Sequence, residues 1–137
     1  MRYWLFKSEP DVFGWDDLVA KAKDGEEWDG VRNYQARNNM REMQIGDLGL
    51  FYHSNRGKEV VGIVEVIATA HPDSTTEDQR WECVDVRAVK PVKQPVTLDQ
   101  AKDDSRLKDM ALVTNTRLSV QPVTDSEWAT IMEMAGM

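Results

Sequence analysis

The sequence predicts an α+β domain in which a small, partly open, mixed β-barrel has helices packed outside it. Three observations support this fold class. Strand and helix signals alternate too irregularly for a doubly wound parallel sheet. The 137 residues contain no repeat, low-complexity tract or linker, so residues 1–137 are expected to form a single domain. The longest strand candidate is apolar on both faces, as expected between a barrel interior and a covering layer of helices.

Three elements are expected in the first third of the chain. Residues Tyr3–Ser8 are rich in aromatic side chains and are followed by Pro10, which is typical of a buried strand and a turn. Residues Trp15–Lys23 carry apolar side chains at helical spacing, with two aspartates in the first turn. Residues Tyr34–Met43 repeat the helical spacing more loosely, and Asn33 is a suitable N-cap for this helix.

A hairpin and a third strand are expected after the turn at Gly46 and Asp47. The hairpin strands are Leu48–Ser54 and Glu59–Ala70, because the residues between them have the length and composition of a hairpin connection. In Trp81–Val89 apolar and charged residues alternate, which indicates a strand with one half-exposed face.

Two short helices are expected near the C-terminus. Thr97 precedes Gln100 by three residues, and Thr124 precedes Glu127 by three, which is the spacing of a capping box. Residues Arg117–Val123 are predicted as a further strand between these helices.

Composition limits the class of protein. Cys83 is the single cysteine, so no internal disulfide can form, and one thiol with two histidines cannot build a zinc finger or ribbon. The longest apolar stretch is too short to cross a bilayer, and the charged N-terminus does not resemble a signal peptide. We therefore expect a cytoplasmic monomer without a metal, a cofactor or a membrane partner.

The charges are distributed unevenly. The net charge of −7 argues against coating duplex DNA by phosphate neutralisation alone. Residues 9–29 hold eight acidic and two basic residues, whereas the following stretch is mainly basic. Its candidates for phosphate contacts are Arg32, Arg37, Arg41, Arg56 and Lys58. An ordinary solvated helix face would explain the same residues.

Signatures of catalysis are missing from the sequence. It has no glycine-rich phosphate loop, no nucleophile elbow and no paired-histidine metal motif. His53 and Ser54 are adjacent, and on a strand their side chains would point to opposite faces, so they cannot act as base and nucleophile. No catalytic residue is therefore assigned, and Cys83 is expected to be an inert core thiol.

Trp28 is the central candidate for binding. It lies in an irregular stretch between two expected helices, where it either packs as a plug or forms the wall of a pocket. Asp29 and Asn33 supply acceptor and donor groups beside it, as recognition of the polar edge of a heterocycle requires. We expect the indole ring to lie open to solvent at the mouth of the barrel, free to cover a base.

Three more segments place polar side chains at strand ends, where binding sites are commonly built. Lys7 to Pro10 ends the first strand. Tyr52 to Asn55 ends the next one, and a polar approach to the hairpin turn explains it equally well. Near the C-terminus, Ser119 and Gln121 alternate with apolar residues and face either a pocket or water.

Together these segments resemble the EVE domain family. The motifs that carry the resemblance are Tyr3-Trp4-Leu5 with Lys7-Ser8-Glu9-Pro10, Trp28 to Asn38, Gly46-Asp47 with Tyr52-His53-Ser54, Val61-Gly62-Ile63, and Leu118 to Pro122. They follow one order along the chain, and the resemblance runs from Tyr3 to the C-terminal helix.

The resemblance implies a PUA-like barrel related to YTH domains, which hold a methylated adenine of RNA in an aromatic pocket. It implies a non-catalytic nucleic-acid-binding module that reads a modified nucleobase, either modified cytosine in DNA or a modified RNA base. The implied contacts are Trp28 stacked on the base, Lys7, Ser8, Asp29 and Asn33 at its polar edge or a neighbouring phosphate, and Tyr52, His53, Ser54 and Gln121 along the remaining wall.

Two other functions stay open. One is a hydrolase-like enzyme on a modified nucleoside with His53 or Glu9 as general base, which rests on fold analogy alone. The other is a protein interaction module, although a last helix docked on the core is the better expectation. Its surface would consist of Trp128, Ile131, Met132 and Met134.

Overall fold

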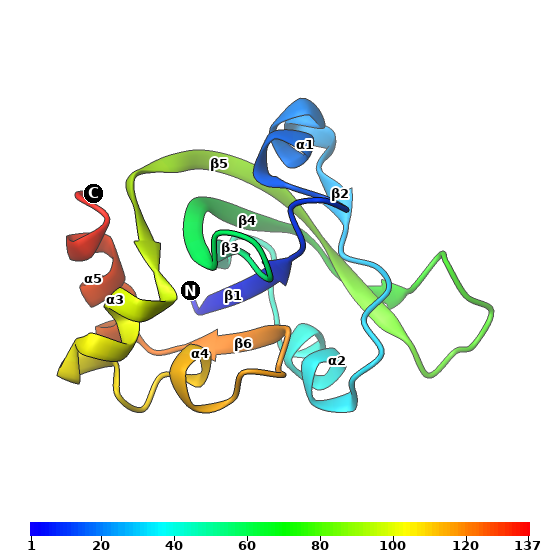
Figure 1. Ribbon diagram of the computed structural model, residues 1–137. Helices are drawn as coiled ribbons and strands as arrows, with labels where there is room; N and C mark the ends of the chain where they lie inside the picture. The colour runs from blue at the N-terminus through cyan, green and yellow to red at the C-terminus, as the bar shows by residue number, and fades with distance from the viewer.

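A six-stranded mixed sheet lies at the centre of the computed structural model, which describes residues 1–137 (Figure 1). The strands are β1 (Tyr3–Ser8), β2 (Glu26–Glu27), β3 (Leu48–His53), β4 (Glu59–Pro72), β5 (Glu82–Thr97) and β6 (Val120–Val123). The helices are α1 (Trp15–Ala20), α2 (Tyr34–Arg41), α3 (Leu98–Asp103), α4 (Ala111–Thr114) and α5 (Asp125–Met134), with single 3-10 turns η1 (Ala22–Asp24) and η2 (Ser105–Leu107). None of the helices has the length and apolar character that a membrane crossing requires.

The sheet is curved and open. Its order is β2-β5-β4-β3-β1-β6, with β1 and β3 parallel and all other neighbours antiparallel. Register shifts along the β4 and β5 pairing bend these long strands, and Figure 1 shows β5 arching over the others. The edge strands β2 and β6 do not pair with each other. The predicted α+β class with outer helices is confirmed, whereas the sheet is not closed into a barrel.

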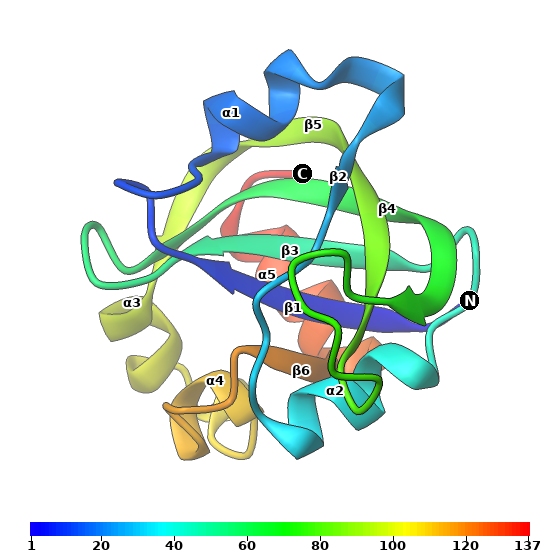
Figure 2. The same cartoon turned by 90° about the vertical axis from the view of Figure 1, so that its right-hand side faces the viewer.

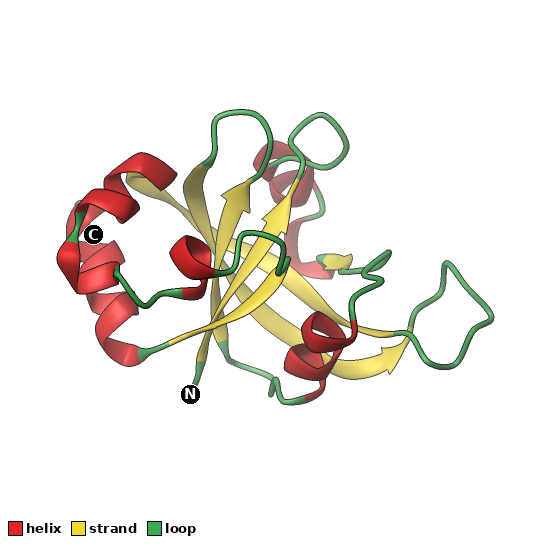
Figure 3. Ribbon diagram, turned by 60° about the horizontal axis from the view of Figure 1, so that its bottom comes forward, coloured by secondary structure: helices red, strands yellow, loops and turns green.

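Side-chain alternation divides the core between the two faces of the sheet. On β1, Trp4 and Phe6 join a cluster with Trp28 and residues of α1 and α2, whereas Leu5 joins a second cluster with residues of α3, α4 and α5. Figure 3 shows the C-terminal helices gathered on one side of the strands. Trp28 and the C-terminal helices therefore lie on opposite faces.

Most predicted elements are confirmed, with shifted ends. The first strand, the hairpin, the helix capped by Asn33 and the two capping-box helices all occur. Helix α1 stops short of its predicted end because the chain turns at Ala22, whose φ is 51°. Strand β5 extends beyond its predicted end at Val89, through Pro91 and Pro95.

The two prolines are tolerated because one edge of β5 is largely uncovered. Strand β2 pairs only with Asp85 and Val86, so the rest of that edge has no strand neighbour that needs a backbone N–H. The short elements β2 and α4 were not predicted.

Candidate functional site

A cavity of about 620 Å³ opens at the carboxyl end of β1. The parallel pairing of β1 with β3 brings two strand ends to this edge, and the antiparallel β6 begins beside Phe6. The volume of the cavity lies in the range typical of small-ligand sites. The cavity is lined by Lys7, Ser8, Glu9, Val12, Phe13, Glu26, Glu27, Trp28, Asp29, Gly30, Val31, Arg32 and Ser119.

Trp28 forms part of the cavity wall, but the prediction that its ring lies open to solvent was wrong. Only 7% of the residue is exposed. Edge-to-face contacts with Phe6, Phe13 and Phe51 hold the indole, at ring-centroid distances of 5.2, 6.4 and 5.7 Å. The physical reason is that this segment joins the sheet, since the Trp28 N–H donates to the Val84 carbonyl at 2.8 Å. The indole is therefore a fixed wall.

Carboxyl groups give the cavity its polar side. Burial and the neighbouring carboxylates of Asp73, Glu27 and Glu26 raise the pKa of Asp29. Burial also opposes ionisation of Glu27, but hydrogen bonds from the Ser74 N–H at 2.7 Å and its hydroxyl at 2.8 Å lower the pKa of Glu27. Glu27 is thus hydrogen-bonded within the protein, whereas the carboxyl group of Asp29, which follows Trp28, is available to a ligand.

Asp73 fixes the segment that carries Trp28. Its carboxylate is 2% exposed and accepts hydrogen bonds from the Gly30 N–H at 2.9 Å and from Arg32 Nη1 at 3.1 Å. Burial alone would raise the pKa of Asp73, but hydrogen bonds from Thr75, Gly30 and Arg32 lower it to about 2. Figure 2 shows the segment between β2 and α2 crossing in front of the sheet, beside the β4–β5 loop that contains Asp73.

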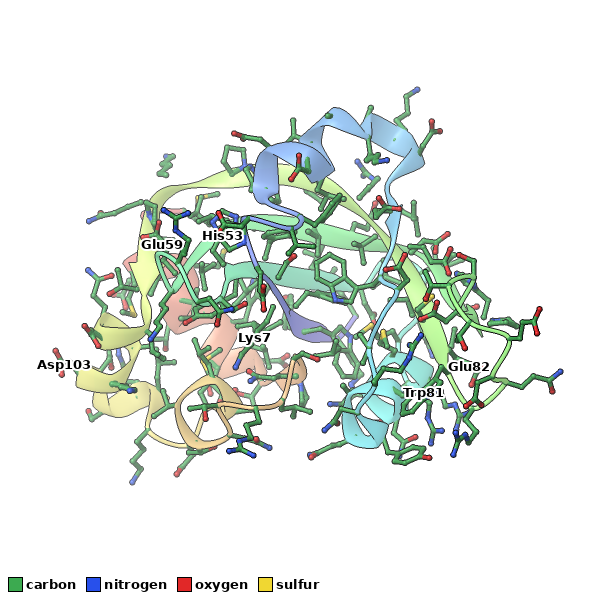
Figure 4. The ribbon with its side chains drawn as sticks, turned by 45° about the vertical axis from the view of Figure 1, so that its right-hand side comes forward. Lys7, His53, Glu59, Trp81, Glu82 and Asp103 are labelled. Atoms are coloured by element: carbon green, nitrogen blue, oxygen red, sulfur yellow. The ribbon has the colours of Figure 1, made fainter.

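The structure brings four of the nine predicted base-pocket residues to the cavity: Lys7, Ser8, Trp28 and Asp29. The Lys7 ammonium is directed elsewhere, because Nζ donates to the Thr116 carbonyl at 2.9 Å and lies 5.9 Å from the centroid of the Tyr52 ring. Figure 4 shows Lys7 between β1 and the connection from α4 to β6. Burial lowers the pKa of Lys7. The Ser8 hydroxyl donates to the Phe13 carbonyl at 2.6 Å, which ties the β1–α1 loop to the strand end.

Five predicted pocket residues do not line the cavity: Asn33, Tyr52, His53, Ser54 and Gln121. The Asn33 side chain accepts from the Ala36 N–H and caps α2. Tyr52 lies in the second core cluster because alternation along β3 turns it to the face opposite Trp28. Gln121 is fully buried, and its Nε2 donates to the Leu118 carbonyl at 2.9 Å.

His53 and Ser54 hold the neighbouring backbone in place. His53 Nε2 accepts from the Trp15 N–H at 3.1 Å, and burial lowers the pKa of His53. The Ser54 N–H donates to the Ser8 carbonyl at 2.9 Å. The nitrogen of His53 that would take up a proton in general-base catalysis is therefore already engaged.

The predicted phosphate contacts lie in two groups. Arg32 lines the cavity, and Arg37 and Arg41 follow on α2, with Arg41 paired to Glu82. Arg56 and Lys58 lie instead in the β3–β4 connection, where Arg56 pairs with Asp11 at 2.9 Å.

Sequence reasoning missed Phe13 and Glu27. Phe13 reaches the cavity because its N–H donates to the Glu9 carbonyl, which folds the chain back after β1. Glu27 reaches it through the pairing of β2 with β5. The turn residues after the first strand were a sequence signal for the position of Phe13. Glu27 had no such signal, because β2 has only two residues.

One group of side chains has the chemistry of metal ligands. The ligand atoms of Glu27, His71 and Cys83 lie within 4.8 Å of one another. Each already has hydrogen-bond partners: the Cys83 thiol donates to Glu27 at 3.3 Å, and His71 Nε2 lies 2.7 Å from Asp85. Burial and the Glu27 carboxylate raise the pKa of Cys83, which keeps the thiol protonated. The group therefore acts as a hydrogen-bonded cluster that joins β2 to β4 and β5.

The last helix is docked on the core. Trp128 stacks on Tyr3 with a centroid distance of 4.3 Å and an interplanar angle of 12°, and Ile131 is fully buried. Met132 and Met134 pack against the second core cluster. The apolar side chains proposed as a partner surface are thus used within the domain.

A sequence profile of the EVE domain matches residues 2–134. The chain belongs to the EVE domain family. Mouse thymocyte nuclear protein 1 (Mus musculus) is 37% identical to this EVE domain, over 97% of this chain and 73% of the mouse protein. The crystal structure of an Agrobacterium tumefaciens protein is 57% identical, with a TM-score of 0.99 over 100% of this chain and 94% of that one. The family recognised from the sequence motifs is confirmed.

Two solved complexes share the fold of this EVE domain. The human THYN1 protein in complex with 5-methylcytosine containing DNA is 34% identical, with a TM-score of 0.91 over 100% of this chain and 99% of that one. The YTH domain of Zygosaccharomyces rouxii MRB1, in complex with N6-methyladenosine RNA, is 19% identical, with a TM-score of 0.59 over 98% of this chain and 86% of that one. The expected relation to YTH domains is confirmed at the level of the fold.

Proposed function

We propose that this EVE domain is a non-catalytic nucleic-acid-binding module that takes one modified nucleobase into the cavity beside Trp28. The observation that carries the proposal is the cavity itself, which joins an immobilised aromatic wall to an available carboxyl group at Asp29. The close likeness to the human protein solved with 5-methylcytosine containing DNA supports the same class of ligand. We further propose that the domain acts as a monomer without a cofactor.

The lining of the cavity favours a base over a phosphate. Glu26, Glu27 and Asp29 would repel an anion, whereas Trp28 and Phe13 offer apolar surface to a planar ring. Carboxylates accept hydrogen bonds, so they suit a base with an exocyclic amino group, which cytosine and adenine carry. Asp29 is the proposed acceptor, and the proposed partner is a modified cytosine or adenine.

The held base must come from a single strand or be extruded from a duplex. Flipping a base costs a few kcal/mol, whereas stacking on an aromatic side chain contributes about 1 to 3 kcal/mol. One base pocket therefore binds an intact duplex weakly, and phosphate contacts from the rim, where Arg32 lies, have to add to it. We expect modest affinity that falls steeply as salt increases.

The proposal is tested with single-stranded DNA and RNA oligonucleotides that differ in one base: cytosine, 5-methylcytosine, adenine or N6-methyladenine. Calorimetric titration should show tighter binding to one modified base than to its unmodified parent. Asp29→Asn should weaken that binding about tenfold, because the amide removes the negative charge and replaces one of the two acceptor oxygens by a donor. Asp109→Asn, in a different cavity, is the matched control and should leave the affinity for every oligonucleotide unchanged. Equal affinity for all oligonucleotides, with no effect of Asp29→Asn, would refute the proposal.

The same samples test the enzymatic alternative. Glu9 lines the cavity, whereas His53 does not and its Nε2 is occupied. Incubation with modified nucleosides and mass analysis should therefore return the nucleosides unchanged. Conversion that Glu9→Gln abolishes would overturn the non-catalytic part of the proposal.

A further inference from the structure

A second aromatic surface lies next to the cavity, to which Arg32 connects it. The rings of Tyr34 and Trp81 are stacked, with centroids 4.9 Å apart and an interplanar angle of 24°. Tyr34 is 50% exposed, and Trp81 is half-buried. Figure 4 shows Trp81 beside α2, far from His53 and Glu59 at the opposite end of the sheet. We call Tyr34, Trp81 and the arginines Arg32, Arg37 and Arg80 the arginine–aromatic platform.

The platform is held together by contacts between distant parts of the chain. Tyr34 is the first residue of α2, and Trp81 lies immediately before β5. Arg37 Nη1 donates to the Arg80 carbonyl at 2.9 Å, and Arg80 Nη1 donates to the Tyr34 hydroxyl at 3.3 Å. These bonds join α2 to the β4–β5 loop, so the two rings have a defined position on the surface.

Arg32 connects the platform to the cavity. It lines the cavity, and its guanidinium carbon lies 5.5 Å from the centroid of the Trp81 ring. Its Nη2 also donates to the Thr75 hydroxyl at 3.3 Å, within the β4–β5 loop. The Arg32 side chain therefore borders both the cavity and the platform. A strand whose base enters the cavity can place its next nucleotide on the platform.

The α2 side of the platform is basic, whereas the β4–β5 loop on its other side carries the acidic residues Asp73, Glu77 and Asp78. Residues 30–41 contain three arginines and no acidic residue, in a chain with 24 acidic and 17 basic residues. Arg32 and Arg80 are paired with Asp73 and Asp78. Arg37 is different, because its hydrogen bonds go to the Arg80 carbonyl and to the Asn38 side chain, and its guanidinium lies 4.8 Å from the centroid of the Tyr34 ring. A cation without a carboxylate partner, next to exposed aromatic surface, matches a phosphate beside a base.

We infer that the arginine–aromatic platform is a second subsite, which binds the nucleotide adjacent to the base held in the cavity. In this arrangement Tyr34 and Trp81 contact the neighbouring base, and Arg37 contacts its phosphate. The inference rests on the proposed function and extends it, because it makes the ligand a nucleic-acid strand of at least two nucleotides and not a free nucleoside.

The test compares a single-stranded trinucleotide that carries 5-methylcytosine with the monophosphate of the same nucleoside. Tyr34→Ala should lower trinucleotide affinity about tenfold, within the range expected for loss of one stacked base, and should leave monophosphate affinity within twofold. Arg37→Gln should lower trinucleotide affinity and reduce the slope of its logarithm against log salt by about 0.7, the effect of one phosphate contact on a single strand.

Two matched control variants come from the face of the sheet opposite Trp28, which carries the second core cluster and α5. Tyr3→Ala removes a ring from the other stacked pair, with Trp128, and Arg106→Gln removes an exposed arginine that pairs with Asp104 and Glu133. Neither should change the affinity for either ligand. Melting temperatures of all four variants establish that they are folded, and Arg37→Gln, at the surface, tests the inference even where Tyr34→Ala lowers stability.

The outcomes separate this inference from the proposed function. Unchanged trinucleotide affinity in both Tyr34→Ala and Arg37→Gln would overturn the second subsite and leave the base cavity standing. Equal losses for trinucleotide and monophosphate would also overturn it, because the platform would then only shape the cavity. If the unaltered domain bound neither ligand, the proposed function would fail and the second subsite with it.

Discussion

The carboxylate of Asp73 is the point where stability and the candidate site are most directly linked. Replacing it by asparagine keeps the shape of the side chain and removes the charge. The amide would place an NH2 group among donors, since Gly30 and Arg32 both direct N–H groups at the same carboxylate oxygen. We expect Asp73→Asn to release the segment that carries Trp28.

The magnitude follows from the pKa of Asp73, which is about 2 in the folded protein against 3.8 for an ordinary aspartate. A shift of nearly two units corresponds to about 2 to 3 kcal/mol of folding free energy. The folded pKa is depressed, so this stabilisation is complete above about pH 5 and is lost progressively as the pH falls toward 2. The free energy of unfolding of Asp73→Asn should therefore lie about 2 to 3 kcal/mol below that of the unaltered protein at pH 7, and the difference should shrink below about pH 5.

Urea denaturation between about pH 3 and pH 7 measures this difference, and amide hydrogen exchange at Gly30 reports the local opening. Asp78→Asn is the control, because Asp78 lies in the same loop and pairs only with the exposed Arg80. It should change stability little. A pH-independent difference between Asp73→Asn and the unaltered protein, or an equal loss in Asp78→Asn, would refute the reasoning.

Three further substitutions test the packing around the site. Gly25→Ala should cost about 3 kcal/mol or more, because Gly25 has a φ of 62° and a Cβ would lie 2.2 Å from the Val86 carbonyl oxygen; chemical denaturation measures the loss. Gly62→Ala should cost about 1 to 3 kcal/mol and lower the melting temperature, because a Cβ would lie 2.4 Å from the Trp15 ring. Asp47→Asn should cost about 2 kcal/mol in a urea titration at pH 7, since this 4%-exposed carboxylate accepts from three N–H groups; unchanged stability would contradict the assignment.

Local signals explain which parts of the fold were predictable. Cap residues and hairpin connections act over a few residues, so Asn33, Thr97 and Thr124 mark their helices correctly. The end of β5 was missed because Pro91 and Pro95 stop a strand only where a neighbour needs their N–H groups. Whether a strand edge is covered depends on the whole sheet order, which no local pattern contains.

In the candidate site, too, local patterns explain some residue positions and long-range pairing explains others. Tyr52 was expected in the pocket with Trp28, yet Tyr52 lies in the second core cluster, whereas Phe51, its neighbour on β3, packs with Trp28 in the first; strand alternation alone is sufficient to separate them. Trp28 is different, because its burial depends on Val84 and Phe51, which lie 56 and 23 positions further along the chain. Sequence reasoning could identify Trp28 as unusual, but its environment is set by long-range pairing.

The burial of Trp28 strengthens the case for a binding site. An exposed indole would lose rotamer freedom when a ligand ordered it, and that loss would reduce affinity. Here Phe6, Phe13 and Phe51 fix the ring before any ligand arrives, and Asp73 fixes the backbone that follows it. The cavity is therefore ordered when the protein folds, and binding does not have to supply that free energy. Under the proposed function, a base would meet a wall already in place, so a small number of contacts with polar groups would suffice to distinguish one base from another.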